Sequence, residues 1–427
     1  MDHINTKATN SHNIKIAYIH ATAFPSKEAN TFDAIWTADA LSKIVDITFF
    51  MPRIKASITR LKEYYEISDS HLKIQPMHLN LLPDRFLLHN QSSYEYFLSQ
   101  LFRYLPQWSG FNGLKVLYVR EPKELLYWGM NRRKNIWMKD WIYCYESHDT
   151  LGLDPNIFFE ACTNRADYQL EAKQETTLTA AQNFDLMICN TQILADDMRT
   201  WSKGTLTPQV LALASPLPRA SRPSRIKYGE KIIIGYIGTI DTLRGVDILL
   251  EAINFLPENY TLRIVGRFRK EQGVDPNWIH KYIANPDIQS RLDINLVDQI
   301  NDVAGEIDRC DILVQPASTN IHDARYAAPL KAYSYMVRGK PIVAGDVLCH
   351  RELFNEGNDA ILYQLTPEQL AARILELGNN PQLAEKIANG AWERGEYFSF
   401  ERKIHDLLSM IENTSMGLSK SSNSVTP

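Results

Sequence analysis

The chain has 427 residues, of which 44% are hydrophobic and 22% are charged. This composition is typical of a folded globular protein, and the length predicts two domains of roughly 200 residues each. The net charge of -4 excludes the strongly basic surface by which nucleic-acid-binding proteins are usually recognised, so no nucleic-acid partner is expected.

The cysteines and the apolar segments indicate the compartment. Five cysteines are scattered along the chain without a CxxC pair, which favours a reducing compartment and argues against a zinc site. The first 13 residues are polar and lack the apolar core of a signal peptide. No apolar run approaches the roughly 20 residues that a transmembrane helix needs. We therefore expect a cytoplasmic protein that holds no metal ion.

In the first half of the chain, short apolar runs alternate with segments of helical periodicity. A helix is expected at residues 32–43, and strands are expected at residues 15–20, 45–50, 115–120, 141–146 and 186–189. Strands separated by helices indicate a parallel sheet that is covered on both faces. Residues 215–229 contain three prolines and no periodicity, which is typical of a linker.

The alternation of strands and helices starts again after this linker. Strands are expected at residues 232–237, 261–265, 312–315 and 341–344, and helices at residues 245–254, 301–309, 367–378, 381–393 and 400–411. The fold class is therefore α/β, with two Rossmann-like domains. Ligands bind at the carboxyl ends of the strands in such sheets, so the cleft between the domains is the expected site.

The same pattern divides the chain into five segments. We expect an N-terminal domain at residues 1–214, a linker at 215–229 and a C-terminal domain at 230–396. A helix at residues 397–412 is expected to cross back to the first domain. The Ser-rich residues 413–427 are expected to form a disordered tail.

Residues 324–346, with the sequence ARYAAPLKAYSYMVRGKPIVAGD, combine a loop, a helix and a buried strand. Pro329 can start the helix, because the N–H that proline lacks has no partner at that position, and Gly339 can end it. The stretch resembles the nucleotide-sugar signature of the retaining family-4 type of GT-B glycosyltransferases, the glycosyl transferases group 1. A Glu in that helix typically holds the ribose of the donor in the family, and Ser334 stands in its place here. The resemblance implies that Lys331 faces the donor phosphates; the alternative is that Lys331 only covers the helix surface.

Residues 232–250 predict a strand that ends at Gly238, a short loop, and a helix that follows Arg244. Such a turn brings backbone N–H groups and one cation to a place where a diphosphate can bind. The alternative is an ordinary turn with a solvated arginine. In the family that the chain resembles, a basic residue at each end of this loop usually grips the diphosphate. Arg244 retains one of these charges, whereas Thr239 replaces the other.

Two segments of the first half also resemble the family. Residues 145–152 place His148 on a loop after a strand, where the family has a His that approaches the donor sugar or the acceptor; the alternative is a hydrogen-bonded surface histidine. Glu146 or Asp149 could supply a carboxylate near the reacting carbon; the alternative for Asp149 is a capping role. Residues 18–41 resemble the family's opening, with Ser26 and Asn30 on the acceptor-side loop; the alternative is a plain strand-to-helix connection.

The resemblance implies a hexosyltransferase-type enzyme of polysaccharide biosynthesis. It would transfer a sugar, with retention and without a metal ion or cofactor, from a nucleotide-diphosphate sugar to a glycan, lipid-linked or other acceptor. Arg244 would neutralise the leaving diphosphate and His148 would orient the sugar, so these two are the expected catalytic residues.

Two other functions stay open. The replacements at Ser334 and Thr239 also suit a non-catalytic homologue that binds a glycan or supports a partner transferase. A sugar-nucleotide epimerase of the same fold is the second alternative. Residues 52–62 alternate basic and apolar side chains and could rest on the inner face of a membrane, or could form a solvated helix face.

Overall fold

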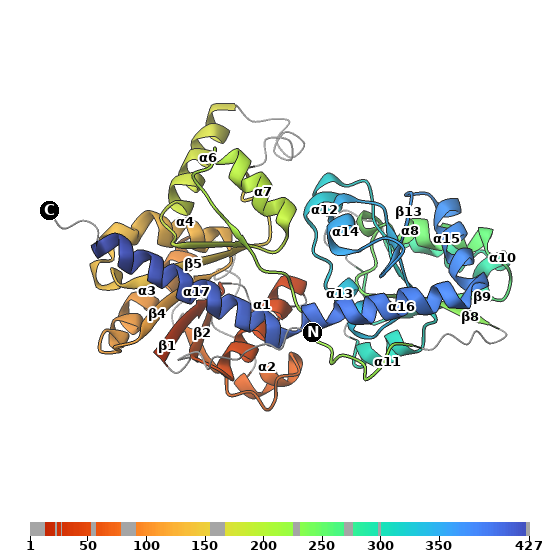
Figure 1. Cartoon of the computed structure of the whole chain (residues 1–427), viewed down its shortest axis with the longest axis horizontal. Helices are drawn as coiled ribbons and strands as arrows, with labels where there is room; N and C mark the ends of the chain where they lie inside the picture. Colours follow the sequence, from red (N-terminus) through yellow and green to blue (C-terminus); the bar gives the residue numbers. More distant parts are fainter. Residues whose placement is uncertain are drawn as a thin grey trace. The chain divides into compact units, whose positions relative to one another are not determined.

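The computed structural model describes residues 13–21, 24–26, 28–52, 57–77, 91–153, 167–224, 231–268, 276–297 and 300–423. The chain forms two compact units (Figure 1). The first comprises Met1–Ala212 together with Lys403–Pro427, and the second comprises Leu213–Arg402. Among the described helices, none combines the length and the apolar character that a bilayer crossing requires.

The first unit is built on a seven-stranded parallel sheet with the strand order β3-β2-β1-β4-β5-β6-β7. Its strands are β1 (Ile14–Ile19), β2 (Asp46–Pro52), β3 (Lys73–Met77), β4 (Leu114–Val119), β5 (Trp141–Ser147), β6 (Leu186–Cys189) and β7 (Gln209–Val210). Its helices are α1 (Ala29–Ser42), α2 (Ile58–Tyr64), α3 (Gln91–Tyr104), α4 (Pro122–Asn131), α6 (Asp167–Ala181), α7 (Gln192–Trp201) and α17 (Phe400–Asn423). Short 3-10 turns lie at Leu105–Trp108, Arg132–Lys134 and Ile136–Met138.

The apolar strand sequences explain this layering. In the centre of the sheet, Ile16 of β1 pairs with Ile47 of β2 on one side and with Val116 of β4 on the other, and all three are buried. Helices on both faces of the sheet remove such side chains from water. The last helix, α17, adds Ile404 and Leu407 to the same core (dark blue in Figure 1).

The second unit repeats the architecture with a six-stranded parallel sheet of order β10-β9-β8-β11-β12-β13. Its strands are β8 (Ile232–Ile237), β9 (Tyr260–Gly266), β10 (Leu292–Leu296), β11 (Ile312–Gln315), β12 (Ile342–Gly345) and β13 (Ile361–Tyr363). Its α-helices are α8 (Val246–Ala252), α9 (His280–Ile283), α10 (Pro286–Gln289), α11 (Val303–Asp308), α12 (Ile321–Tyr326), α13 (Leu330–Val337), α14 (Leu348–Leu353), α15 (Pro367–Asn379) and α16 (Pro381–Gly395). Its 3-10 turns lie at Thr242–Arg244, Ile253–Phe255, Pro276–Ile279 and Glu396–Phe398.

The expected fold class, two Rossmann-like domains, is confirmed by these two parallel sheets. The nine strands expected from the sequence are present, with ends that differ by at most a few residues. The four strands that the sequence analysis missed, β3, β7, β10 and β13, are the four edge strands of the two sheets. An edge strand is paired on one side only and is often short, so it lacks the continuous apolar run that marks a central strand.

Two segments differ from expectation. The tail expected from residue 413 is helical to Asn423, because extending a helix that packing has already nucleated costs little per residue. The expected linker begins within the second unit: Ala220 N donates to Val337 O at 2.9 Å, Ser224 N donates to Gly339 O at 2.9 Å, and the Arg219 guanidinium lies 3.4 Å from the centre of the Trp392 ring. Residues 225–230 of that linker, and residues 53–56 of the expected membrane-facing segment, lie outside the described residues.

Candidate functional site

The turn after β8 holds two of the residues expected to bind the donor. Gly238 has a φ of +153°, and a Cβ atom at this position would lie 2.9 Å from Cε of Lys331. Glycine therefore lets the lysine side chain pack directly against the backbone of the turn. The next residue, Thr239, accepts a hydrogen bond on its carbonyl oxygen from the Tyr236 hydroxyl at 2.5 Å, which fixes the course of the loop.

Arg244 is held at the start of the following helix. The Asp241 side chain accepts a hydrogen bond from Arg244 N at 3.2 Å and so caps the 3-10 turn Thr242–Arg244. Gly245 then adopts φ +72°, and a Cβ there would lie 2.2 Å from Ala317 O, so only glycine fits. Nε of Arg244 lies 3.7 Å from an Asp241 carboxylate oxygen, and within the described ranges it has no hydrogen-bond partner.

Lys331, from the first turn of α13, is the second cation at this turn. It is partly buried, and its Nζ lies 5.2 Å from the centre of the Tyr236 ring. Burial, with the nearby Arg244 charge adding to it, lowers the pKa of Lys331 to about 7. The described residues give its ammonium group neither a hydrogen bond nor an ion pair. The structure therefore brings Gly238, Thr239, Arg244 and Lys331 together at one turn, where Arg244 forms an ion pair with Asp241 and Lys331 forms none with a described residue.

Ser334 lies one helical turn after Lys331 and is only 4% exposed. Its Oγ lies 3.3 Å from Oγ of Ser215 and donates to the carbonyl oxygen of Leu330, also at 3.3 Å. The hydroxyl group is thus used in packing α13 against the segment that follows Leu213. Its expected contact with a donor ribose stays a prediction.

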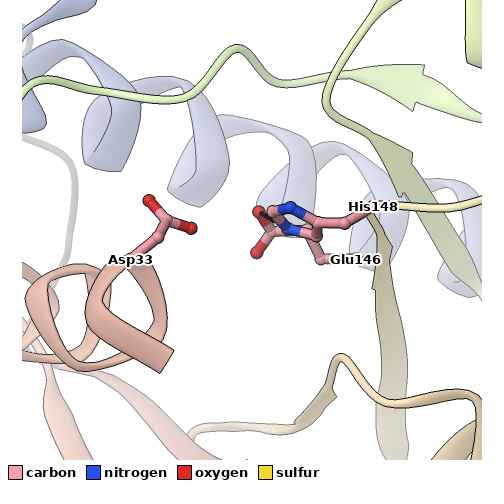
Figure 2. Close-up of side chains that lie close together, drawn as sticks. All are labelled: Asp33, Glu146 and His148. Carbon is pink, nitrogen blue, oxygen red and sulfur yellow. Dashed lines mark hydrogen bonds and ion pairs between the residues drawn. The ribbon is translucent and has the colours of Figure 1, made fainter. Parts of the chain in front are cut away.

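His148 belongs to the first unit and follows β5 directly. Its Nε2 lies 2.9 Å from Oε1 of Glu146 and 2.5 Å from Nη2 of Arg120. Figure 2 shows the imidazole ring beside the Glu146 carboxylate, with Asp33 of α1 pointing toward both. The Glu146 side chain is fully buried, whereas the side chain of His148 is 19% exposed.

A buried ionic network lies behind His148. Arg120 donates from Nη2 to Asp33 at 2.7 Å, and Nζ of Lys403 lies 3.1 Å from Asp33, 3.0 Å from the Thr37 hydroxyl and 3.8 Å from Glu146. Burial alone would raise the pKa of both carboxyls, but Lys403 and Arg120 outweigh it and lower the pKa of Asp33 and, strongly, that of Glu146. Two carboxylates and two cations therefore balance each other.

The same residues raise the question of a metal ion. Asp33, Glu146 and His148 each offer one ligand atom, and these atoms lie within 4.8 Å of one another. Both carboxylates, however, already form ion pairs with Arg120 or Lys403. A metal ion would have to displace two buried cations, so this donor set does not fit a metal site in its present arrangement.

The residues expected on the acceptor side also lie in the first unit. Ser26 N donates to the Tyr65 hydroxyl at 2.8 Å, and that hydroxyl donates to Ser26 O at 3.1 Å. The Asn30 side chain, in the first turn of α1, donates to Glu121 at 3.0 Å. Asp149 accepts a hydrogen bond from Leu151 N at 2.7 Å, which gives it a local role in its loop.

The sequence analysis missed Asp33, Arg120 and Lys403. A signal was present for two of them, because Lys403 lies on the apolar face of α17 with Leu407 and Ile411, and Asp33 lies among the buried residues of α1. A charged residue on an apolar helix face indicates a buried partner, since an unpaired buried charge is too costly. The identity of that partner cannot be read from the helix alone.

Part of the chain matches a known protein family. Residues 219–394 match the family model described as Glycosyl transferases group 1. An uncharacterized glycosyltransferase of Methanocaldococcus jannaschii is 24% identical over 181 residues, which cover 42% of this chain and 48% of that protein. The match thus spans about half the length of that curated relative.

Solved structures match over nearly the whole chain. HepE of Anabaena in complex with UDP has a TM-score of 0.67 at 14% identity, and the match covers 93% of this chain and 100% of that one. Sucrose-phosphate synthase of Thermosynechococcus elongatus has a TM-score of 0.66 at 14% identity, with 93% and 98% covered. The predicted GT-B fold is therefore confirmed, and residues 219–394, which lie in the second unit, match the glycosyl transferases group 1.

Proposed function

We propose that the protein transfers a sugar from a nucleotide-diphosphate sugar to a glycan, lipid-linked or other acceptor, with retention and without a metal ion. The observation that carries this proposal is the pair of cations, Arg244 and Lys331, at the glycine turn after β8. Asp241 lies beside Arg244 at 3.7 Å, and Lys331 forms no ion pair with a described residue. A diphosphate supplies an anion that both cations can contact.

The chemistry of the leaving group gives these cations a catalytic role. When the bond between the sugar and the diphosphate breaks, negative charge grows on the departing oxygen. A fixed cation lowers the energy of that charge most when it is already in place, because no reorganisation is needed during the reaction. Arg244 is the residue that neutralises the leaving group in this proposal, because a guanidinium group can contact two phosphate oxygens at once. Backbone N–H groups of the turn at Gly238 and Thr239 add further donors in this proposal.

The proposal also assigns a role to the first unit, where His148 orients the sugar and the loop of Ser26 and Asn30 contacts the acceptor. Nucleotide binding is a sound first test because one neighbour in fold was solved with UDP and another form of it with UDP-glucose. Those ligands were bound to that protein. A panel of nucleotides is therefore needed to identify the base and the sugar that this chain prefers.

The test compares a diphosphate with a nucleoside. We expect UDP, or another nucleoside diphosphate of the panel, to bind the wild type in titration calorimetry. Arg244→Ala should weaken that binding about 10- to 100-fold, because a charge-assisted bond to phosphate is lost, and should leave the binding of the free nucleoside unchanged. Lys281→Ala is the matched control, since Lys281 is an exposed cation of the same unit. Equal losses for both ligands would place Arg244 outside the diphosphate site.

A non-catalytic role is the second candidate, and one observation favours it. Ser334 replaces the carboxylate of the family's signature and is buried against Ser215. A homologue that has lost the ribose contact could bind a glycan or support a partner transferase. Nucleotide-sugar hydrolysis separates the two: turnover of any donor in the panel supports the transferase, and binding without turnover of any donor supports the non-catalytic role.

A further inference from the structure

Two groups contact one ring nitrogen of His148, and they require opposite protonation states of that nitrogen. Nη2 of Arg120 lies 2.5 Å from Nε2, and Oε1 of Glu146 lies 2.9 Å from the same atom. A guanidinium group only donates hydrogen bonds, and a carboxylate only accepts them. Nε2 can therefore accept a hydrogen bond from Arg120 through its lone pair, or donate one to Glu146 through a bound proton, but it cannot do both.

The surroundings favour Arg120. Glu146 also accepts a hydrogen bond from the Tyr118 hydroxyl, and cations lie near both of its oxygens, with Lys403 3.8 Å from Oε1 and Nε of Arg120 3.6 Å from Oε2. Nη2 of Arg120 has two hydrogens: one goes to Asp33 at 2.7 Å, and the other is directed to His148. A proton on Nε2 would set two N–H groups against each other at 2.5 Å, at the shorter of the two contacts.

We propose that Arg120 is a positioning residue that fixes His148 as the tautomer with its proton on Nδ1, so that Nδ1–H is the group His148 offers to an oxygen of the bound sugar. The identity of the ligand in this inference rests on the proposed function, whereas the assignment of the tautomer does not depend on it. It makes His148 a hydrogen-bond donor that orients a hydroxyl group, with no part as a proton shuttle.

The neighbour of Nδ1 agrees with this assignment. The Asn190 amide nitrogen lies 3.5 Å from Nδ1, at the limit of a hydrogen bond, and Oδ1 of Asn190 is buried without a hydrogen-bond partner among the described residues. The two ends of an asparagine amide look alike and can be exchanged by a half turn. After that turn, Oδ1 faces Nδ1–H and gains a partner in the free protein, which a lone pair on Nδ1 would not provide. At 3.5 Å this contact is weak, so an oxygen of the bound sugar can replace Oδ1 as the acceptor.

The wild-type protein tests the tautomer directly. In protein labelled with 15N in histidine only, long-range proton–nitrogen correlation spectra distinguish a protonated ring nitrogen from an unprotonated one. The signals of His148 are identified by their loss in His148→Asn, and the exposed His280 serves as the unconstrained reference. At pH 8 we expect the proton of His148 on Nδ1. A proton on Nε2 would overturn the proposal.

Two variants test the cause and the use of this tautomer. Glu146→Gln removes the competing carboxylate and should leave the proton on Nδ1, whereas a change would show that Glu146 sets the tautomer.

In the donor hydrolysis assay, His148→Asn places an amide N–H near the position of Nδ1, and His148→Gln places one near that of Nε2. We expect the Asn variant to retain at least tenfold more activity than the Gln variant. The reverse order would overturn the assignment of Nδ1–H, while unchanged UDP binding would leave the proposed function standing.

Discussion

The two units treat buried charge in opposite ways. In the first, Asp33 and Glu146 are matched by Arg120 and Lys403, and all four are at least 97% buried. In the second, Lys331 and Arg244 lie together, and the pKa of Lys331 falls to about 7 through burial and the Arg244 charge. The balanced network needs no ligand and can hold His148 in a fixed position. In the second unit Asp241 forms an ion pair with Arg244 only, so an anion that also contacts Lys331 would stabilise the two cations further, which is the property expected of a binding site.

The largest effect is expected from breaking the balanced network. Lys403→Met leaves two buried carboxylates with one cation, and we expect a loss of about 3–5 kcal/mol in the free energy of unfolding, measured with urea. Lys139→Met, which removes an exposed cation of the same unit, is the control and should change stability by less than about 0.5 kcal/mol.

A double variant sharpens this prediction. Asp33→Asn combined with Lys403→Met restores the charge balance, because one carboxylate and one cation remain. We expect it to recover part of the stability lost in Lys403→Met alone, since the excess buried negative charge is gone. If Lys403→Met is as stable as the control, the ion pairs of Lys403 contribute little and the network is not the support of His148.

A smaller loss is expected from Ser334→Glu in the second unit. The position is 4% exposed and its hydroxyl faces Ser215, so a carboxylate there loses hydration. We expect a loss of about 1–3 kcal/mol in thermal or urea unfolding. Ser334→Ala, the control, should cost at most about 1 kcal/mol, the value of one hydrogen bond. Tighter UDP binding by the Glu variant would instead mean that this helix face reaches the ribose, as in the family signature.

The smallest effect concerns the pH dependence of donor binding. A bound diphosphate favours the charged form of Lys331 and raises its pKa above the value of about 7 in the free protein. The affinity for UDP-glucose should therefore be highest below pH 7 and fall about tenfold between pH 7 and pH 8.5. Lys331→Arg keeps its charge throughout this range and should bind with little dependence on pH. The same slope in both proteins would mean that another group titrates.

The central strands could be predicted from the sequence because a strand that is buried on both faces is a continuous run of apolar residues. β8, with the sequence IIIGYI, and β11, with ILVQ, are continuous apolar runs, and their ends were predicted correctly. β10 lies at an edge of the sheet and reads LDINL, with an exposed Asp293 and Asn295. It lacks the continuous apolar run of a central strand, and its five residues give only a short alternation of apolar and polar side chains, which the sequence analysis did not detect.

The candidate site divides in a similar way. Gly238, Arg244 and Lys331 could be predicted because a glycine turn and a helix start are local features. Lys403 could not be placed, because its partner Asp33 lies 370 residues earlier in the chain. Ser334 could be aligned with the family signature, but its packing against Ser215 depends on how the segment after Leu213 crosses α13.

The wide separation of Lys403 and Asp33 also bears on the order in which the protein folds during synthesis. The core of the first unit includes residues of α17, so it stays open until α17 has left the ribosome. Roughly 190 residues separate the two parts of that unit, which at 5–20 residues per second amounts to a delay of roughly 10–40 s. The second unit, which is continuous in the sequence, is complete first. A growing chain therefore carries the carboxylates of Asp33 and Glu146 in an unfinished core until Lys403 arrives.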